Sequence, residues 1–309
     1  MAKRGWLAVA ILAAWATTLG FNAKRLYFRP MSELLADAAR TIPPGTSYYA
    51  VFQGDRQIGW AQTDIDTLPG HSGFLLEDRL ILRESLLPGM EPMRLTVEAT
   101  LGPTFTLRSF QVVAEGVPGI RQVQGEVQGD SVLSLRMRGD SGTRSERLRL
   151  DEPIVVAAAW PLRFAAAREV ETGEQFELGV YDPITGVQRP MRLTVLEQRM
   201  RSFPDSVTVE DGRWVTARED TVMAWRVEHD VSGIKLEAWV DEDGRLLEAA
   251  APGGIRLVRT AFELAYFGEF VPERMRLPKD RSSGATEEGA PVGGESDVRQ
   301  DDAATTGNR

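Results

Sequence analysis

The sequence predicts a mainly β (α+β) protein: a single large curved antiparallel sheet or half-barrel that wraps one or two helices and is preceded by a transmembrane helix. Three observations lead to this fold class. Apolar and polar residues alternate over many short segments between residues 46 and 278. Pairs of Gly, Asp and Pro separate these segments. Helical periodicity is confined to a few places, so strands and helices do not alternate as in a parallel α/β sheet.

The N-terminal residues 1–25 are predicted to form a signal anchor that crosses the membrane. Lys3 and Arg4 precede an uncharged apolar run over residues 6–23, which as a helix spans about 27 Å, enough to cross a bilayer. A cleaved signal peptide is the alternative, but Phe21-Asn22-Ala23 lacks the small residue that cleavage prefers three positions before the cut. We expect a retained single-pass anchor in the inner (cytoplasmic) membrane, with the C-terminal body on the extracytoplasmic, periplasmic side.

Residues 26–45 are predicted to form a linker helix and the chain that follows it. Leu34, Leu35 and Ala38 make one apolar side, and Ser32 is placed to cap the helix. Pro43 and the proline after it end the helix.

The first group of strands follows this helix. Met93, Leu95 and Val97 are typical of it, because each is separated from the next by a polar residue, as in a half-buried strand. The predicted strands of this group are residues 48–52, 57–64, 74–84, 93–101, 105–113, 123–127, 132–137 and 145–150.

An alanine-rich segment, residues 154–168, interrupts the β pattern and predicts a helix that Pro161 kinks or splits. A second group of strands is then predicted over residues 175–181, 191–200, 205–210, 213–217, 221–230, 234–240, 245–250, 256–263 and 267–275. The turn at Asp243-Gly244 is the clearest hairpin signal. Residues 46–278 are therefore predicted to form one extracytoplasmic β domain, and residues 279–309, rich in Gly, Ser, Glu and Asp, are predicted to be a disordered acidic tail.

Composition excludes several classes of function. The formal net charge of −9 argues against binding of nucleic acid, which needs surplus Lys and Arg. The chain has no cysteine and only His71 and His229 as histidines, so neither a thiol nucleophile nor a three-histidine metal site is expected. Asp241, Glu242 and Asp243 are interpreted as a solvated hairpin tip. We expect a non-enzymatic protein with no catalytic residues, no metal and no cofactor.

Aromatic residues are the most informative group, because they occur on nearly every predicted strand. On a curved sheet half of them face inward, where they build either a filled core or an apolar ligand cavity. The two alternatives use the same residue types, so the sequence leaves both open. The candidate cavity residues are Phe52, Trp60, Phe74, Phe105, Phe110, Trp160, Phe164 and Trp225.

Several segments resemble a known class of bacterial envelope proteins. The segments are residues 47–60 (SYYAVFQGDRQIGW), 105–110, 180–186, 237–247 and 252–260, and they occur in the same order as in that class. Over residues 40–275 the chain resembles the β-rich extracytoplasmic region found upstream of transglutaminase-like domains. That region is similar in pattern to periplasmic lipoprotein-carrier folds, in which a curved sheet wraps a helix and encloses an apolar cavity. The chain has no cysteine for a transglutaminase-like catalytic domain, so no catalytic residue carries over.

Two functions are consistent with these expectations. The first is a membrane-anchored carrier-like domain that binds a lipid or other apolar ligand and contacts the lipid membrane through its N-terminal helix. The second is a protein–protein accessory module for an envelope enzyme, such as a transglutaminase-like protein supplied in trans. A carrier predicts an apolar cavity, and an accessory module predicts a filled core with an exposed apolar patch.

Overall fold

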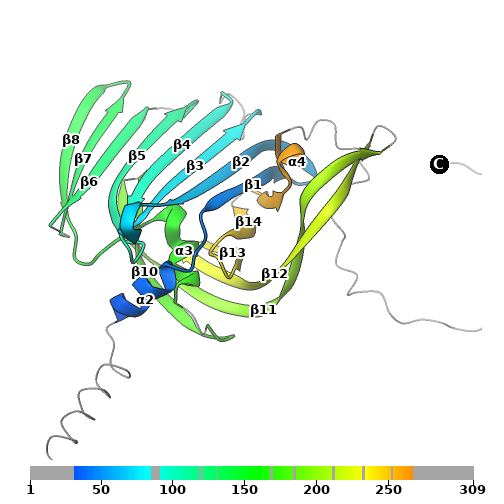
Figure 1. Ribbon diagram of the computed structural model, residues 1–309. Coiled ribbons are helices and arrows are strands. Elements are labelled where there is room, and N and C mark those ends of the chain that lie inside the picture. Colours follow the sequence, from blue (N-terminus) through cyan, green and yellow to red (C-terminus); the bar gives the residue numbers. More distant parts are fainter. Residues whose placement is uncertain are drawn as a thin grey trace, which may run out of the picture. The chain divides into compact units, whose positions relative to one another are not determined.

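The computed structural model describes residues 31–266, apart from short gaps at 85–90, 118, 120, 130, 168–169, 184–185, 211–212, 232–233 and 252. The described chain forms one sheet of fifteen strands with a few short helices (Figure 1). No helix within these residues is long and apolar enough to cross a membrane. The predicted anchor, the tail and the last predicted strand, 267–275, lie outside the described residues.

The first half of the chain is an up-and-down meander. Each strand pairs with the next one along the sequence, as short polar turns dictate. The strands are β1 (Gly45–Gln53), β2 (Arg56–Thr67), β3 (Phe74–Leu82), β4 (Met93–Leu101), β5 (Leu107–Glu115), β6 (Gln122–Gln128), β7 (Val132–Gly139) and β8 (Gly142–Arg149).

The second half continues the same sheet on the other side of β1. Its strands are β9 (Val155–Val156), β10 (Gln175–Asp182), β11 (Val187–Glu210), β12 (Arg213–Val231), β13 (Ile234–Asp241), β14 (Leu246–Ala251) and β15 (Ile255–Thr260). The sheet runs from β8 down to β1, then through β15 back to β9, so the first and last described strands are neighbours.

The sheet is mixed and not purely antiparallel, which corrects the sequence prediction. β9 runs parallel to β10, while all other neighbours are antiparallel. The cause is the segment between them, which crosses over as the 3₁₀ turn η2 (Ala157–Ala159) and the helix α3 (Trp160–Ala165). A crossover of this kind returns the chain in the same direction. Pro161 lies in the first turn of α3, where its missing N–H costs nothing, so it starts the helix and does not kink it.

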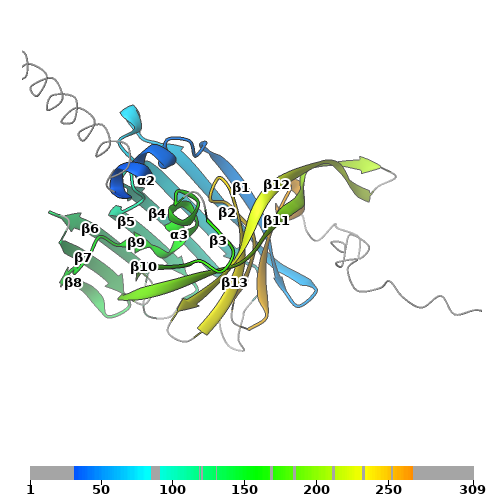
Figure 2. The same cartoon turned by 90° about the horizontal axis from the view of Figure 1, so that it is seen from below.

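The remaining helices are short. α2 (Met31–Ala39) lies within the predicted linker helix, η1 (Pro69–His71) is a 3₁₀ turn, and α4 (Phe262–Tyr266) replaces the end of a predicted strand. Seen from below, α3 lies within the curve of the sheet and α2 lies beside it (Figure 2). The sheet therefore curves around α3, and we call the face toward α3 the inner face.

The main core lies between the inner face of β2–β7 and the elements that close over it. Leu76, Phe110 and Leu135 are inward-facing strand residues and are buried together with Leu35 of α2 and Leu162 of α3. The β9–β10 end of the sheet packs against β5 here. The Leu107 N–H donates to the Ile154 carbonyl at 2.8 Å, and the rings of Phe110 and Tyr181 are 5.5 Å apart.

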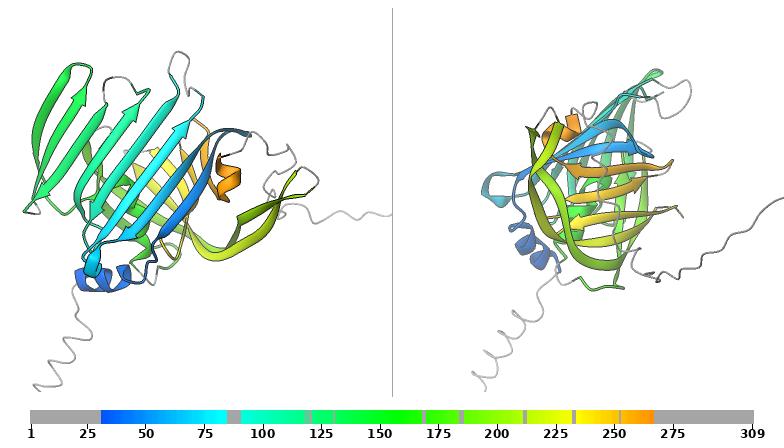
Figure 3. Two further views of the ribbon diagram at one scale, coloured as in Figure 1. Left: turned by 45° about the horizontal axis from the view of Figure 1, so that its top comes forward. Right: turned by 90° about the vertical axis from the view of Figure 1, so that its right-hand side faces the viewer.

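β11 and β12 form one long hairpin, where the sequence predicted two pairs of shorter strands. The hairpin extends past its neighbours (Figure 3). The register shifts between Pro204 and Ser206, so a β-bulge accommodates the proline inside the strand.

Candidate functional site

An apolar pocket of about 320 Å³ lies where α2, the end of α3, β12 and the β13–β14 turn meet. We call it the α2–α3 pocket. It is lined by Ala38, Thr41, Ile42, Phe164, Ala165, Val170, Trp225, Glu242 and Asp243. Its volume is at the lower end of the range of small-molecule sites, about 300–1,000 Å³, and a mostly apolar lining with a few polar groups is typical of them.

Two aromatic residues form one wall of the pocket. Phe164 is almost fully buried on α3, and its ring packs edge-to-face on Trp225 of β12, with centroids 6.2 Å apart at 78°. Phe176 packs against Phe164 at 5.9 Å and 88°. Trp225 pairs with Val240 of β13, which belongs to the same buried cluster as Phe164. The wall is thus fixed by both the sheet and the helix.

Trp225 also contributes an unsatisfied hydrogen-bond donor. Its indole Nε1 is buried and has no hydrogen-bond partner within the described residues. An indole N–H can only donate, and a buried donor without a partner costs about 1–3 kcal/mol.

The acidic side of the pocket comes from the β13–β14 turn. Asp241 organises this turn, because its Oδ1 accepts the N–H groups of Asp243 at 3.1 Å and Arg245 at 2.8 Å. Its Oδ2 accepts Arg259 Nη1 at 2.8 Å. Burial raises the pKa of Asp241, and the Arg245 N–H and the Arg259 charge oppose that rise. Glu242 and Asp243 are left to line the pocket.

The interpretation of residues 241–243 as a solvated tip is therefore wrong for Asp241, which is only 2% exposed. The reason is tertiary: Arg259 comes from β15 and the turn packs on α3. Gly244 has φ of 74°, and a Cβ there would lie 2.7 Å from the Leu162 Cα. Glycine is needed at this turn both for its conformation and for the approach to α3.

The eight candidate cavity residues fall into three groups. Phe74, Phe105 and Phe110 are buried in the main core, where Phe105 stacks on Phe74 at 4.6 Å. Trp160, Phe164 and Trp225 belong to the second cluster, and Phe164 and Trp225 line the pocket. Phe52 and Trp60 lie elsewhere: Arg256 is 5.9 Å from the Phe52 ring, and Trp60 packs on Tyr266 of α4 at 4.0 Å. The structure does not bring the eight into one site.

Seven pocket residues were not among the candidates: Ala38, Thr41, Ile42, Ala165, Val170, Glu242 and Asp243. Ile42 and Val170 lie in loops just after α2 and α3, where no periodic pattern marks them. Glu242 and Asp243 were noticed as an acidic run, but nothing in the sequence connects that run to an aromatic wall.

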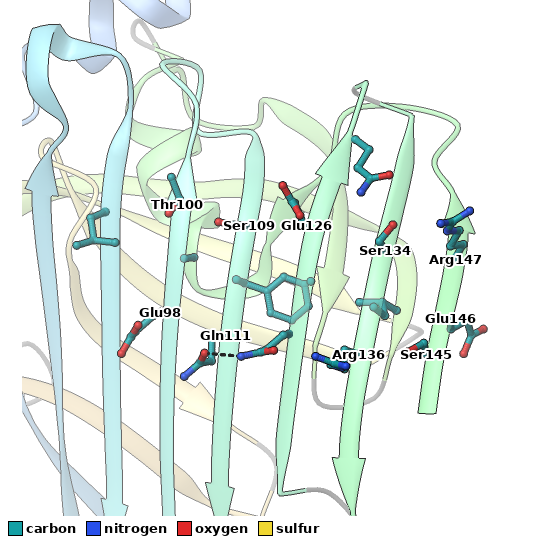
Figure 4. Close-up of a pocket in the computed structure, with 17 residues that line it drawn as sticks. Glu98, Thr100, Ser109, Gln111, Glu126, Ser134, Arg136, Ser145, Glu146 and Arg147 are labelled. Atoms are coloured by element: carbon teal, nitrogen blue, oxygen red, sulfur yellow. Dashed lines mark hydrogen bonds between the residues drawn. The ribbon is translucent and has the colours of Figure 1, made fainter. Parts of the chain in front are cut away.

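A larger and more open groove of about 900 Å³ lies on the outer face of β3–β8. Its lining is mainly polar and carries both charges, including Glu98, Glu126, Arg136 and Arg147. Figure 4 shows Glu98 on β4, Gln111 on β5 and Arg136 on β7, and Gln124 Nε2 of β6 donates to Gln111 Oε1 at 2.8 Å. The groove is an open polar sheet surface and not an apolar cavity.

Two titratable groups lie on the inner side. Asp78 follows Phe74 and Leu76 at the spacing of the inner face, and Thr63 Oγ1 donates to its Oδ1 at 2.5 Å. Burial raises the pKa of Asp78 to about 7. His229 on β12 is 8% exposed with its ring 5.4 Å from Trp160, and burial lowers its pKa. Within residues 31–266, apart from the gaps, no group of three or more His, Cys, Asp or Glu is placed to hold a metal ion.

Comparisons with known proteins give little. No protein-family model and no curated protein match the chain. A crystal structure of a DUF1089 family protein from Pseudomonas aeruginosa is similar over 63% of this chain and 90% of that chain, at 15% identity and a TM-score of 0.34. A likeness this distant carries no argument about fold or function.

Proposed function

We propose that this protein binds an apolar ligand in the α2–α3 pocket, as a non-enzymatic, membrane-anchored envelope protein with a carrier-like β domain. The observation that supports the proposal best is the pocket itself: an aromatic wall with aliphatic neighbours. An apolar ligand would fill the volume and cover these side chains.

The position of α2 adds to this proposal. α2 contributes to the pocket and begins at residue 31, soon after the apolar run over residues 6–23. An anchor at that run would keep the pocket close to a bilayer, from which an apolar ligand could exchange.

The accessory-module alternative predicts an exposed apolar patch. The exposed large apolar residues of the described chain are Leu75, Val187, Met200, Val209 and Phe262. They come from β3, β11 and α4, and single exposed apolar residues are normal on protein surfaces. The pocket therefore favours ligand binding over a partner module.

The test is a titration of the full chain with N-phenyl-1-naphthylamine, an uncharged apolar fluorophore. Ala165→Phe places a ring into the pocket from a half-buried lining position and should weaken binding at least tenfold. Ala36→Phe, half-buried on α2 but outside the lining, is the matched control and should bind as the wild type does. Absence of binding by the wild type, or equal affinity of both variants, would contradict the proposal.

A further inference from the structure

The charge of the pocket lining selects among apolar ligands. Its two charged residues, Glu242 and Asp243, are both acids. Within the described chain neither carboxylate forms an ion pair, whereas their neighbour Asp241 is paired with Arg259. The pocket lining therefore carries two negative charges that no ion pair within the described residues neutralises.

The basic residues nearest to the pocket on α2, α3 and the β13–β14 turn do not line it and hold other partners among the described residues. On α3, Arg163 Nη1 donates to the Thr104 carbonyl at 2.7 Å. In the β13–β14 turn, Arg245 Nη2 donates to the Pro43 carbonyl at 3.2 Å. Arg40, after α2, is paired with Asp37 at 3.2 Å. Among the described lining residues, Glu242 and Asp243 therefore have no basic side chain beside them inside the pocket.

The aromatic wall fits the same conclusion. Phe164 and Trp225 both line the pocket, and aromatic rings attract cations, with tryptophan the strongest. Aromatic walls combined with carboxylates suit an organic cation such as a quaternary ammonium group, which lacks the hydration that an apolar pocket would remove at high cost. A bare metal ion does not fit, because calcium takes about 6–8 oxygen ligands and this lining is mostly carbon.

We propose that the ligand of the α2–α3 pocket is a single-chain amphiphile with a cationic head group. The head group lies between the aromatic wall of Phe164 and Trp225 and the carboxylates of Glu242 and Asp243. The alkyl chain lies against the aliphatic lining of Ala38, Ile42 and Val170. This inference rests on the proposed function, since it names the ligand class of the same pocket. An anionic amphiphile of the same chain length would be repelled by the two carboxylates.

Three ten-carbon amphiphiles test the inference: decyltrimethylammonium, decyl maltoside and decanoate, each below its critical micelle concentration. Calorimetric titration of the full chain at low salt should give the tightest binding for the cation and the weakest for the anion, at least tenfold apart. The difference should shrink as salt is added, because ions screen exposed charges.

Glu242→Gln with Asp243→Asn should bring the three affinities together while the uncharged probe still binds. The control, Glu98→Gln with Glu126→Gln, makes the same charge change in the outer groove and should keep the preference. Equal wild-type affinities, or a preference that survives the Glu242 and Asp243 changes, would overturn this inference and leave apolar binding in place. If none of the three amphiphiles binds while N-phenyl-1-naphthylamine does, this inference fails and the proposed function stands. If the dye does not bind either, both fail. If the double variant does not fold, the salt dependence of amphiphile binding by the wild type still tests the inference.

Discussion

The two faces of the sheet carry hollows of opposite character. The outer groove is the larger, at about 900 Å³, but it is an open surface lined mainly by polar and charged residues, with Gln124 hydrogen-bonded to Gln111. The α2–α3 pocket is about 320 Å³, and it is more enclosed and lined mainly by apolar and aromatic residues. The difference teaches that an enclosed apolar lining, and not volume, marks the better site for an apolar ligand.

The same strands produce both faces. Glu98, Gln111, Gln124 and Arg136 form one row across β4–β7 on the outer face. One residue further along, Ala99, Phe110, Gly125 and Leu135 form the inner row. A Cβ at Gly125 would lie 2.1 Å from Phe110 Cε1, so the inner row packs only because that position has no side chain.

The largest effect is expected at the pocket wall. Phe164→Ala removes a ring that is 2% exposed and touches Phe176 and Trp225, so it should cost about 3–5 kcal/mol of unfolding free energy. Urea denaturation measures the loss. Phe164→Leu keeps most of the volume and should cost less than about 2 kcal/mol, while weakening binding of the cationic probe more than that of the uncharged one. Equal weakening of both would show that the wall supplies volume alone.

The second effect concerns the turn that carries the acidic residues. Asp241→Asn can still accept the two backbone N–H groups, but it leaves Arg259, whose side chain is 11% exposed, without its counter-charge. Removing one member of a buried ion pair is strongly destabilising, so we expect a loss of about 3 kcal/mol. Asp243→Asn in the same turn should cost less than about 1 kcal/mol. Similar losses for the two variants would restore the view of a solvated tip.

Asp241 also illustrates which features of the structure could not be predicted from the sequence. Strand β4 was predicted at the residues where it is found, because alternation is a local property of a half-buried strand. The burial of Asp241 depends on Arg259 of β15, and the pocket depends on α2 meeting α3 and a turn about 200 residues later. Contacts between segments so far apart in the chain produce no periodic pattern in the sequence. Phe164 and Trp225 were candidates because they are aromatic, not because any pattern joined them.

A third prediction separates buried from exposed carboxylates. The pKa of Asp78 rises from 3.8 to about 7 in the folded state, so folding favours its protonated form. The stability gained is complete below about pH 4 and is lost as the pH rises through 7. Asp78→Asn should abolish this loss and be more stable than the wild type at pH 8, by about 1–2 kcal/mol after allowance for the solvent that reaches part of the side chain.

The measurement for Asp78 is the difference between variant and wild type in urea denaturation from pH 5 to pH 8. Taking the difference cancels His229, whose pKa is lowered by burial and whose contribution therefore falls as the pH decreases. Glu98→Gln on the outer face is the control and should keep the wild-type pH slope. A slope in Asp78→Asn equal to that of the wild type would show that this carboxyl is solvated in the folded protein.

The smallest effect is expected in the outer groove. This prediction tests the comparison of the two faces most directly. Gln124→Ala removes the hydrogen bond to Gln111, and both side chains are half-buried on a face that water reaches. The expected cost is about 0.5–1 kcal/mol, because water replaces much of a hydrogen bond at such a position. Binding of the uncharged and cationic probes should be unchanged, since the groove lies on the opposite face of the sheet from α3. Urea denaturation and the same calorimetric titrations check both expectations. A tenfold loss of affinity in Gln124→Ala, with the fold intact by circular dichroism, would make the polar groove the ligand site and would reverse the roles assigned to the two faces.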